Sequence, residues 1–559
     1  MDKWLTSQNF KGGKDAGGPD ACTRECANVL ERELKLHVPG PSREPLANAL
    51  RHMGARDQRL RACYFDTQNR DLARAGVALR LRLEGDQWVQ TIKAPGPDEL
   101  SRIELNHPRP NSELDLTLYK DSVIEPMLAG LEHALKIRYE TDVNRLTLVQ
   151  ETSQGVVELA CDRGVVRSGK LVFEIWELEL EQVSGHMSAV FTLARQWLQQ
   201  YGLILDLRSK AERGDQLARA ITMPAPKRAG KVRLEKTMTV RQAYTLSLGE
   251  CVSQIIRNAT SLAGVDTAEA DTHAKFEYAQ YLRVGMRRLR SCLKFYGKWE
   301  KVNKLLNDQR LRDYFDFLGD VRDQDVLRFH IAPQLAKAGM PDLPVPVTAP
   351  ATADTSAGSA AARGANQNAP KNGAPPQTQT SLPAVYTASA GPAQLAGDVA
   401  FQQYLLDLLE TLLSLGDQQK PRKIDERELG EVLGKRLKKW LKQICRRGVH
   451  FEHLAIDAQH DLRKKLKRLR YCVELSSSVL SDTRLVALRP LLRQMQHTMG
   501  DLNDLYNAEV AYQGLATTDA AAFKAVSWTR ERQSQIKHQI EVDFRTLTRE
   551  VLGEEPDEA

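Results

Sequence analysis

The segment Glu31-Arg32-Glu33-Leu34-Lys35-Leu36 constrains the N-terminal part of this chain more than any other stretch. In an extended strand, successive side chains point to opposite faces. Glu31, Glu33 and Lys35 then share one face, and the two leucines lie on the other. Two carboxylates and an ammonium on one face suit a metal-bound polyanion, because the acids bind the cation and the base binds the anion.

Later segments repeat this alternation of charged and apolar residues. Arg80 and Arg82 alternate with leucines, and Glu177, Glu179 and Glu181 alternate with Leu178 and Leu180. The ordinary explanation is a half-buried sheet with leucines inside and charges in water. Two features argue against it. Basic strands near 80–102 and acidic strands near 158–181 are sorted by sign, and the three neighbouring glutamates repel one another unless a cation binds.

Composition limits the class of protein. The 559 residues predict roughly two to four domains. The net charge of +7 argues only weakly for an acidic partner. The 8 cysteines are scattered, which predicts neither a disulfide framework nor a zinc site. The first residues are polar and glycine-rich, and no apolar run approaches the roughly 20 residues of a membrane span. We therefore expect a cytoplasmic protein that is not embedded in a membrane.

The chain divides into two regions of different character. Residues 29–222 predict an antiparallel β domain whose last helix runs from about 184 to 201, and residues 238–555 show helical apolar spacing throughout. A linker is expected at 223–237. Disorder is expected in a leader at 1–28 and in an insert at about 341–398, where few large apolar residues offset the entropy of ordering. The strands are expected at Cys63–Asp66, Ala78–Leu83, Trp88–Lys93, Ser101–Asn106, Glu140–Gln150, Gly155–Asp162 and Leu171–Glu181, and a helix within Pro41–Asp57.

The helical half contains an internal duplication. Arg283–Arg290 reads RVGMRRLR and Arg463–Arg470 reads RKKLKRLR, and a Gly-Asp-x-x-Asp segment follows each run at a similar distance. On a helix, the first, fifth and eighth residues of each run share one face. A solvated basic face is the usual explanation for a single run. Its duplication favours a surface that binds a polyanion.

The ordered charged motifs of the β domain resemble the CYTH superfamily, also called triphosphate tunnel metalloenzymes. They are Glu31-x-Glu33-x-Lys35, Tyr64-Phe65-Asp66-Thr67, Arg80-x-Arg82, Thr91-Ile92-Lys93, Arg102-x-Glu104, Glu158-x-x-x-Asp162, Glu177-x-Glu179-x-Glu181 and Ser209-Lys210-x-x-Arg213. The resemblance implies an α+β protein with an eight-stranded antiparallel barrel. Its charged lumen holds a triphosphate and a divalent metal, and its leucines face outer helices.

The resemblance also implies a role for each matching residue. The metal ligands, for Mg²⁺ or Mn²⁺, are Glu31, Glu33, Asp162, Glu177 and Glu179. The substrate-binding cations are Lys35, Arg80, Arg82, Lys93, Arg102, Arg145, Lys210 and Arg213. The implied reaction is metal-assisted attack of water on a terminal phosphoryl group. The motifs do not identify the residue that orients the water, for which Lys35 is a candidate. Asn106 stands where a third charged residue is expected after Arg102-x-Glu104.

The duplicated helical half resembles the CHAD domain, a helical bundle of two repeats whose family binds inorganic polyphosphate. The family usually has a histidine three residues before the basic run. His460 keeps it, whereas Gln280 replaces it in the first repeat. The implied polyphosphate-binding residues are Arg283, Arg287, Arg288, Arg290, His460, Arg463, Lys464, Lys467, Arg468 and Arg470. Nucleic acid is disfavoured as a partner because few aromatic residues interleave with the basic runs.

Together these motifs predict a metal-dependent inorganic triphosphatase with a polyphosphate-binding domain, associated in the cytoplasm with polyphosphate granules. Three alternatives stay open from the sequence. The first two, a class IV-type adenylate cyclase and a thiamine triphosphatase, share the tunnel. The third is a scaffold that binds polyphosphate granules without turnover.

Overall fold

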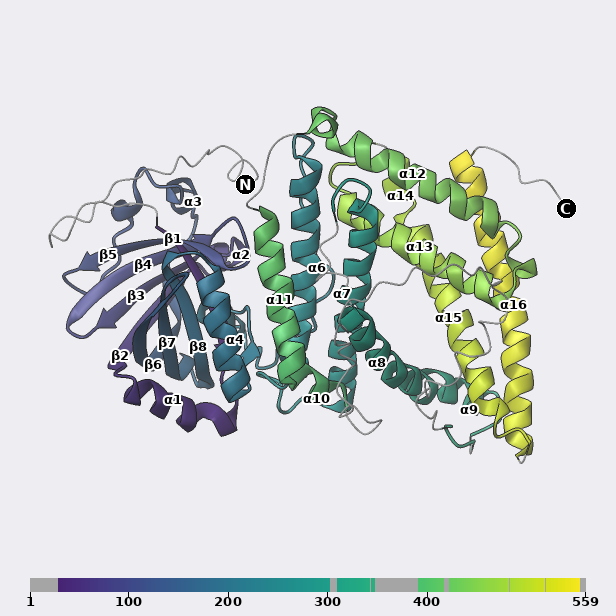
Figure 1. The fold of residues 1–559 in the computed structure, drawn as a ribbon, viewed down its shortest axis with the longest axis horizontal. Coiled ribbons are helices and arrows are strands. Elements are labelled where there is room, and N and C mark those ends of the chain that lie inside the picture. The colour runs from purple at the N-terminus through teal and green to yellow at the C-terminus, as the bar shows by residue number, and fades with distance from the viewer. Residues whose placement is uncertain are drawn as a thin grey trace, which may run out of the picture.

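The computed structural model describes residues 29–301, 309–341, 343–346, 391–416, 422–481, 483–517 and 519–552. A β-rich N-terminal domain lies beside a helical C-terminal domain (Figure 1). The predicted leader, and residues 347–390 of the predicted insert, lie outside the described residues. Within the described ranges, every helix is too short or too polar to cross a lipid bilayer.

Antiparallel strands form a closed barrel in the N-terminal domain. They are β1 (Val29–His37), β2 (Arg56–Asp66), β3 (Ala78–Glu84), β4 (Gln87–Pro95), β5 (Ser101–Arg109), β6 (Lys136–Thr152), β7 (Gly155–Ser168) and β8 (Leu171–Gly185). They pair in the order β5-β4-β3-β2-β6-β7-β8-β1, and β1 also pairs with β5, which closes the ring. The short β9 (Ile204–Leu205) adds to β1. The predicted eight-stranded antiparallel barrel is confirmed.

Strand β8 shows which way the charges point. Leu178 and Leu180 are fully buried in a core that also contains residues of the outer helices α1 (Arg43–His52) and α4 (Ser188–Tyr201). Glu177 and Glu179, on the opposite face of the same strand, are buried as well. A solvated sheet would leave these carboxylates in water. The charges therefore face the lumen and the leucines face outward, as predicted.

Helix α5 (Lys210–Leu217) closes one end of the lumen. Leu217 packs there with inward-facing residues that include Tyr64 and Tyr139. Ser209 caps the helix by accepting a hydrogen bond from the Glu212 N–H at 3.1 Å. Gly214 lies against the Tyr139 ring, where any Cβ would overlap ring atoms. The sequence placed Lys210 and Arg213 after the last helix of the domain, which was wrong because α5 itself carries them.

The N-terminal domain, called the tunnel domain below, has two shorter helices, which are α2 (Asp71–Arg74) and α3 (Glu125–Ala129). The predicted Pro41–Asp57 helix is α1, which ends at His52, because β2 begins at Arg56. The first residues of β2 are charged and exposed, so they carry no apolar alternation from which a strand could be predicted.

The C-terminal domain is all-helical. Its helices are α6 (Val240–Leu262), α7 (Thr272–Tyr296), α8 (Gln309–Val326), α9 (Ala332–Lys337), α10 (Pro392–Gly397), α11 (Val399–Gly416), α12 (Leu429–Gly448), α13 (Ile456–Ser476), α14 (Thr483–Ala487), α15 (Arg489–Gln513) and α16 (Ala520–Leu552). The basic runs lie on α7 and α13, which pack together where the Cys472 thiol is 3.7 Å from the Ser291 carbonyl oxygen. Helix α10 lies inside the segment predicted to be disordered, so that prediction does not hold for its six residues.

The two domains share a continuous core. Helix α11 lies between α4 of the tunnel domain and α6 (Figure 1). Arg195 of α4 pairs with Asp407 of α11 at 2.9 Å. The predicted linker has no helix or strand, but Val232 and Leu234 are buried in this core. The linker is therefore packed against the helical domain along part of its length.

Candidate functional site

Three buried carboxylates come together in the lumen. Asp162 of β7 and Glu177 and Glu179 of β8 each place a ligand oxygen within 4.8 Å of the others. The register explains the grouping, because Asp162 pairs with Glu177 across the two strands and Glu179 follows on the same face. Within the described part of the chain, this is the one group of three or more potential metal ligands that lie so close together. It contains three of the five predicted metal ligands.

Cations from three separate elements surround these carboxylates. Lys35 of β1 donates to Glu179 at 2.5 Å. Arg145 of β6 grips Asp162 with two hydrogen bonds of 2.7 Å and reaches Glu179 at 2.6 Å. Lys210 of α5 lies 2.6 Å from Asp162 and 3.0 Å from Glu179, and also donates to Glu177. The structure therefore brings three of the predicted substrate-binding cations to the acids: Lys35, Arg145 and Lys210.

The balance of charge differs among the three carboxylates. Burial raises the pKa of Glu179, but Lys210, Lys35 and Arg145 outweigh it and hold that pKa well below its usual range. Arg145 and Lys210 likewise hold the pKa of Asp162 low against burial. At Glu177, burial and the neighbouring Glu179 keep the pKa raised in spite of Lys210. The charge of Glu177 is therefore less fully compensated than that of the other two carboxylates, and an additional cation beside it would be stabilised.

A second acidic pair lies on the β1–β5 side of the lumen. Lys93 of β4 donates to Glu31 at 2.6 Å and lies 3.2 Å from Glu104 of β5. Burial raises the pKa of Glu31 to about 8. Burial also acts on Glu104, but Lys93, a hydrogen bond with Glu31 and Arg80 together outweigh it and lower the pKa of Glu104 to about 2. The two carboxyl groups therefore titrate as a pair, with Glu31 holding its proton more tightly than Glu104. Glu31 is not part of the three-carboxylate group.

Glu33 lies between the two acidic groups in charge, because Lys35 and Lys93 together hold its pKa low against burial. Its carboxylate lies 2.8 Å from the Lys35 ammonium, which also contacts Glu179. Among the acids, the site assignment missed Glu104, although the Arg102-x-Glu104 motif contains it. The motif carried a signal for its position in the lumen but not for its role as a partner of Lys93.

The remaining predicted cations vary in how closely they approach the acids. Arg80 lies 3.8 Å from Glu104 and donates to the Tyr64 hydroxyl at 3.4 Å. Arg82 pairs with Glu84 on its own strand. Arg102 donates to the Ser101 carbonyl at 2.8 Å and forms no ion pair with a described residue. Arg213 of α5 lies 3.2 Å from Glu177.

The basic runs of the helical domain occupy a different environment. Arg290 of α7 is exposed, and its guanidinium stacks over Phe315 of α8 at 5.4 Å. Like charges crowd the crossing with α13. Arg468 is the main cause of the lowered pKa of Lys294, and burial together with Arg290 lowers the pKa of Arg468 itself. The pKa values of Lys294 and Arg468 are thus lowered by neighbouring cations, whereas carboxylates raise those of Lys35 and Lys210 in the lumen.

Two predicted polyphosphate-binding residues point into the protein. Arg288 is 1% exposed and donates to Gln254 of α6 at 2.5 Å. Arg283 is buried with its guanidinium stacked over Phe315 at 5.0 Å. The assignment of Arg288 to a binding surface was therefore wrong, because a ligand in solution cannot reach it. Helical spacing alone could not separate it from its exposed neighbours.

The other predicted residues lie on or near the surface of α7 and α13. Arg463 donates to Asn503 at 2.9 Å, and Arg470 donates to Gln496 at 2.5 Å. His460 lies beside Tyr506, with ring centroids 6.0 Å apart. Arg287, Lys467 and Arg468 are partly exposed, and Lys464 is exposed.

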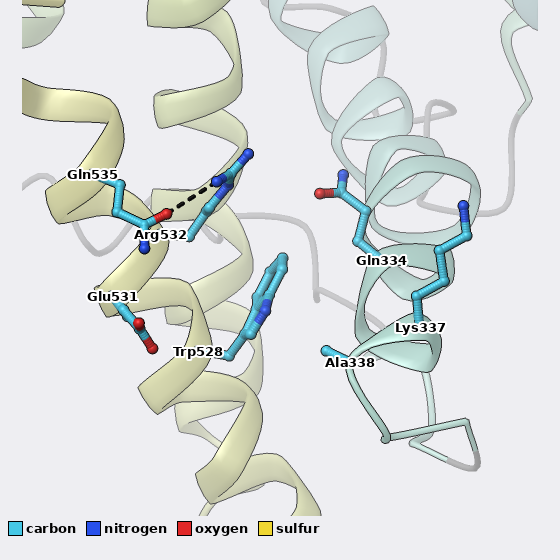
Figure 2. Close-up of a pocket in the computed structure, with 7 residues that line it drawn as sticks. All are labelled: Gln334, Lys337, Ala338, Trp528, Glu531, Arg532 and Gln535. Carbon is cyan, nitrogen blue, oxygen red and sulfur yellow. Dashed lines mark hydrogen bonds between the residues drawn. The ribbon is translucent and has the colours of Figure 1, made fainter. Parts of the chain in front are cut away.

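A separate depression of about 380 Å³ lies between α9 and α16 (Figure 2). Trp528 and Arg532 of α16 face Gln334 and Lys337 of α9 across it, and Arg532 donates to Gln535 at 2.9 Å. None of its lining residues was predicted from the motifs. Most of them are exposed, so the depression is open to water.

Comparisons with known proteins agree with this architecture. The family model of the CYTH domain matches residues 30–214, and that of the CHAD domain matches residues 247–513. The inorganic triphosphatase of Haemophilus influenzae is 28% identical over 158 residues, which is 27% of this chain and 44% of that protein. The match therefore spans less than half of that relative's length.

Two solved structures have a limited similarity to parts of this chain. The CHAD domain of Ricinus communis has 19% sequence identity and a TM-score of 0.39, and the match covers 59% of this chain and 97% of that one. A Hippeastrum adenylyl cyclase candidate, described as having a dominant triphosphatase activity, has 18% identity and a TM-score of 0.26 over 35% of this chain and 98% of its own. With the two family models matched in order, the chain is a CYTH–CHAD protein, whose tunnel and helical region are those two domains.

Proposed function

We propose that the tunnel hydrolyses inorganic triphosphate with Mg²⁺ or Mn²⁺. The supporting observation is the buried group of Asp162, Glu177 and Glu179, ringed by cations inside a closed barrel. A structural role alone does not account for so many buried charges, because desolvating ions costs more than most buried pairs return. The named relative from Haemophilus influenzae is consistent with this reaction.

The donor set fits a hard divalent cation. Three carboxylates offer oxygen ligands, which Mg²⁺ and Mn²⁺ prefer, and leave positions for phosphate oxygens or water. When bound, the metal supplies a Lewis acid that polarises a phosphoryl group. Lys210 contacts all three carboxylates, so its ammonium offsets part of their charge in the absence of the ion.

The surrounding cations suit a triphosphate. Lys35, Lys93 and Arg145 project into the lumen from different strands, so they can contact separate phosphoryl groups and offset the charge of the leaving phosphate. Carboxylates hold the pKa of Lys35 well above its usual range despite burial. A protonated Lys35 donates hydrogen bonds and suits contact with a phosphoryl oxygen.

A substrate panel tests the proposed reaction. The full chain is incubated with tripolyphosphate, ATP or thiamine triphosphate, in Mg²⁺, Mn²⁺ or EDTA, and both phosphate and cyclic AMP are measured. We expect metal-dependent phosphate release that is fastest with tripolyphosphate. Cyclic AMP from ATP would instead identify a cyclase, and preferential cleavage of thiamine triphosphate would identify that substrate. No turnover of any substrate would leave the scaffold alternative.

We further propose that the surface of α7 and α13 binds polyphosphate. The proposal rests on the crowding of Arg290, Lys294 and Arg468, whose mutual repulsion an anion would relieve. A polyphosphate chain has a negative charge on each phosphate unit, so it can bridge several of these cations. Binding is measured with long-chain polyphosphate and the full protein. Association with polyphosphate granules would follow from it.

A further inference from the structure

One residue of the helical domain reaches the charge network of the tunnel. Asp266 lies between α6 and α7, and its carboxylate is 8% exposed. Its backbone is left-handed, with a φ of 61°. Aspartate, asparagine and glycine adopt this conformation more readily than other residues. The turn therefore presents a buried carboxylate toward the neighbouring domain.

Asp266 pairs with two arginines of the tunnel domain. Its Oδ1 lies 3.1 Å from Nη2 of Arg213, and its Oδ2 lies 2.9 Å from Nη1 of Arg208 without the alignment of a hydrogen bond. Arg208 is already neutralised by Asp206, with contacts of 2.9 and 2.6 Å. Arg213, by contrast, is shared between Asp266 and a carboxylate of the lumen, because its other terminal nitrogen, Nη1, lies 3.2 Å from Oε2 of Glu177.

Asp266 and Glu177 therefore compete for the same cation, the guanidinium of Arg213. Arg213 is held on one side by Asp266 and on the other by Glu177, which belongs to the three-carboxylate group. If Asp266 lost its charge, Arg213 would be neutralised mainly by Glu177. The carboxylate would then be less available to a metal ion, and the local potential would become more positive by one charge.

We propose that Asp266 is a positioning residue through which the helical domain sets the metal affinity of the tunnel. By sharing the Arg213 guanidinium, it weakens the interaction of Arg213 with Glu177 and leaves that carboxylate more available to a divalent cation. The inference rests on the proposed function only in placing that cation at the three carboxylates. It means that the helical domain contributes a charged group to the tunnel site, in addition to any polyphosphate that it binds.

The test is Mn²⁺ binding to the full chain without substrate, measured by titration calorimetry for the wild type and for Asp266→Asn. Asparagine keeps the size and the left-handed backbone but removes the charge. We expect roughly 10-fold weaker Mn²⁺ binding, the size of effect seen when outer-shell partners of a metal site are changed. Asp266→Gly, which tolerates the same φ, should give the same result if the asparagine variant folds poorly.

The matched control is Glu212→Gln. Glu212 lies on the same helix as Arg213 and pairs across the same interface, with Arg257 of α6 at 2.6 Å, but it does not belong to the three-carboxylate group. Its loss should leave Mn²⁺ binding unchanged. An equal weakening in both variants would overturn the inference, because general docking of the domains would then explain the effect. Unchanged Mn²⁺ binding in Asp266→Asn would also overturn it.

A double-mutant cycle identifies the intermediary. In an Arg213→Gln background, Asp266→Asn should cause little further change, because the guanidinium that it positions is gone. Full additivity of the two changes would contradict the proposed route. A wild-type chain that binds Mn²⁺ but releases no phosphate would refute the triphosphatase proposal and leave this inference standing. A wild-type chain without Mn²⁺ binding would refute both.

Discussion

The cations of the tunnel and those of the helical repeats have different neighbours. In the lumen, Lys35, Lys93 and Lys210 each lie within 3 Å of at least one carboxylate, and those carboxylates are buried or nearly so. At the crossing of α7 and α13, Arg290 and Arg468 lie among other cations and near the surface. The first arrangement is nearly neutral and suits an anion that arrives with a metal. The second has excess positive charge and suits an anion alone.

Removing one lumen acid should have the largest effect. Glu179→Gln keeps the shape of the side chain but deletes the charge that Lys35, Arg145 and Lys210 share. We expect the rate of tripolyphosphate hydrolysis to fall by about 10³-fold or more, since a metal ligand and the balance of three cations are lost together. Phosphate release is the measurement.

Glu140→Gln provides the control for this change. Glu140 is an exposed carboxylate of the same barrel, on β6, and should leave the rate unchanged. Polyphosphate binding should be normal in both variants, because the helical surface is untouched. Near-normal hydrolysis by Glu179→Gln would show that the lumen charges are structural.

Reversing charge on the helical surface should weaken polyphosphate binding and leave the tunnel unaffected. The double variant Arg290→Glu and Lys464→Glu places two negative charges on exposed positions of α7 and α13. We expect about 30-fold weaker binding of long-chain polyphosphate at low salt, and a smaller loss at high salt because exposed charges are screened. Fluorescence anisotropy with labelled polyphosphate measures this.

Lys524→Glu, an exposed change on α16, is the matched control for charge reversal. It should bind polyphosphate nearly as the wild type does. The double variant should keep its hydrolytic rate, since neither residue lies in the tunnel. Equal loss of binding in the control and the double variant would show that polyphosphate responds to the net charge of the protein and not to a specific surface on α7 and α13.

Replacing one glycine in each domain by alanine should change the free energy of unfolding in opposite directions. Gly214→Ala forces a Cβ into the Tyr139 ring, and overpacking of this kind costs about 1–3 kcal/mol of unfolding free energy. Gly500→Ala, inside α15, meets no atom within 4 Å and should instead stabilise the chain by up to about 1 kcal/mol. Denaturant unfolding measures both. A neutral Gly214→Ala would contradict the close packing of α5 against β6.

The smallest expected effect concerns His460. Burial and the neighbouring Arg463 and Lys464 lower its pKa, so the imidazole is neutral at pH 7 and gains charge only below its usual range. Polyphosphate affinity should therefore rise as the pH falls from 7 toward 5.5, by roughly a few-fold. His460→Gln, which copies Gln280 of the first repeat, should remove this pH dependence. An unchanged pH profile would exclude His460 from the surface.

The barrel could be predicted because charged and apolar residues alternate along its strands. Glu177 and Glu179 alternate with Trp176, Leu178 and Leu180, and the sorting of charge by strand argued against an ordinary solvated sheet. The burial of both faces of this strand agrees with that argument. The helix that carries Lys210 and Arg213 was missed, because its eight residues are mostly polar. Its place at the end of the lumen comes from Leu217, Gly214 and the Ser209 cap, which are tertiary and local features without a long apolar period.

The site was only partly predictable for a similar reason. A motif gives the strand and the face of a residue, but it does not give the partner that a side chain selects across the lumen. Arg145 and Lys210 reach the three carboxylates, whereas Arg82 pairs with Glu84 beside it. Arg288 shares the composition of its exposed neighbours and is nevertheless buried against Gln254. Asp266 lies far from every motif in sequence and meets Arg213 only through domain packing.

The central claim is that a metal-bound polyphosphoryl anion occupies the lumen. The most direct measurement is the anomalous diffraction of Mn²⁺ in crystals grown with a non-hydrolysable imido analogue of tripolyphosphate. We predict a Mn²⁺ peak about 2.1 Å from oxygens of Asp162, Glu177 or Glu179, with phosphoryl groups contacting Lys35 and Arg145. Mn²⁺ and the analogue bound only outside the barrel, with the lumen ion pairs intact, would contradict the account.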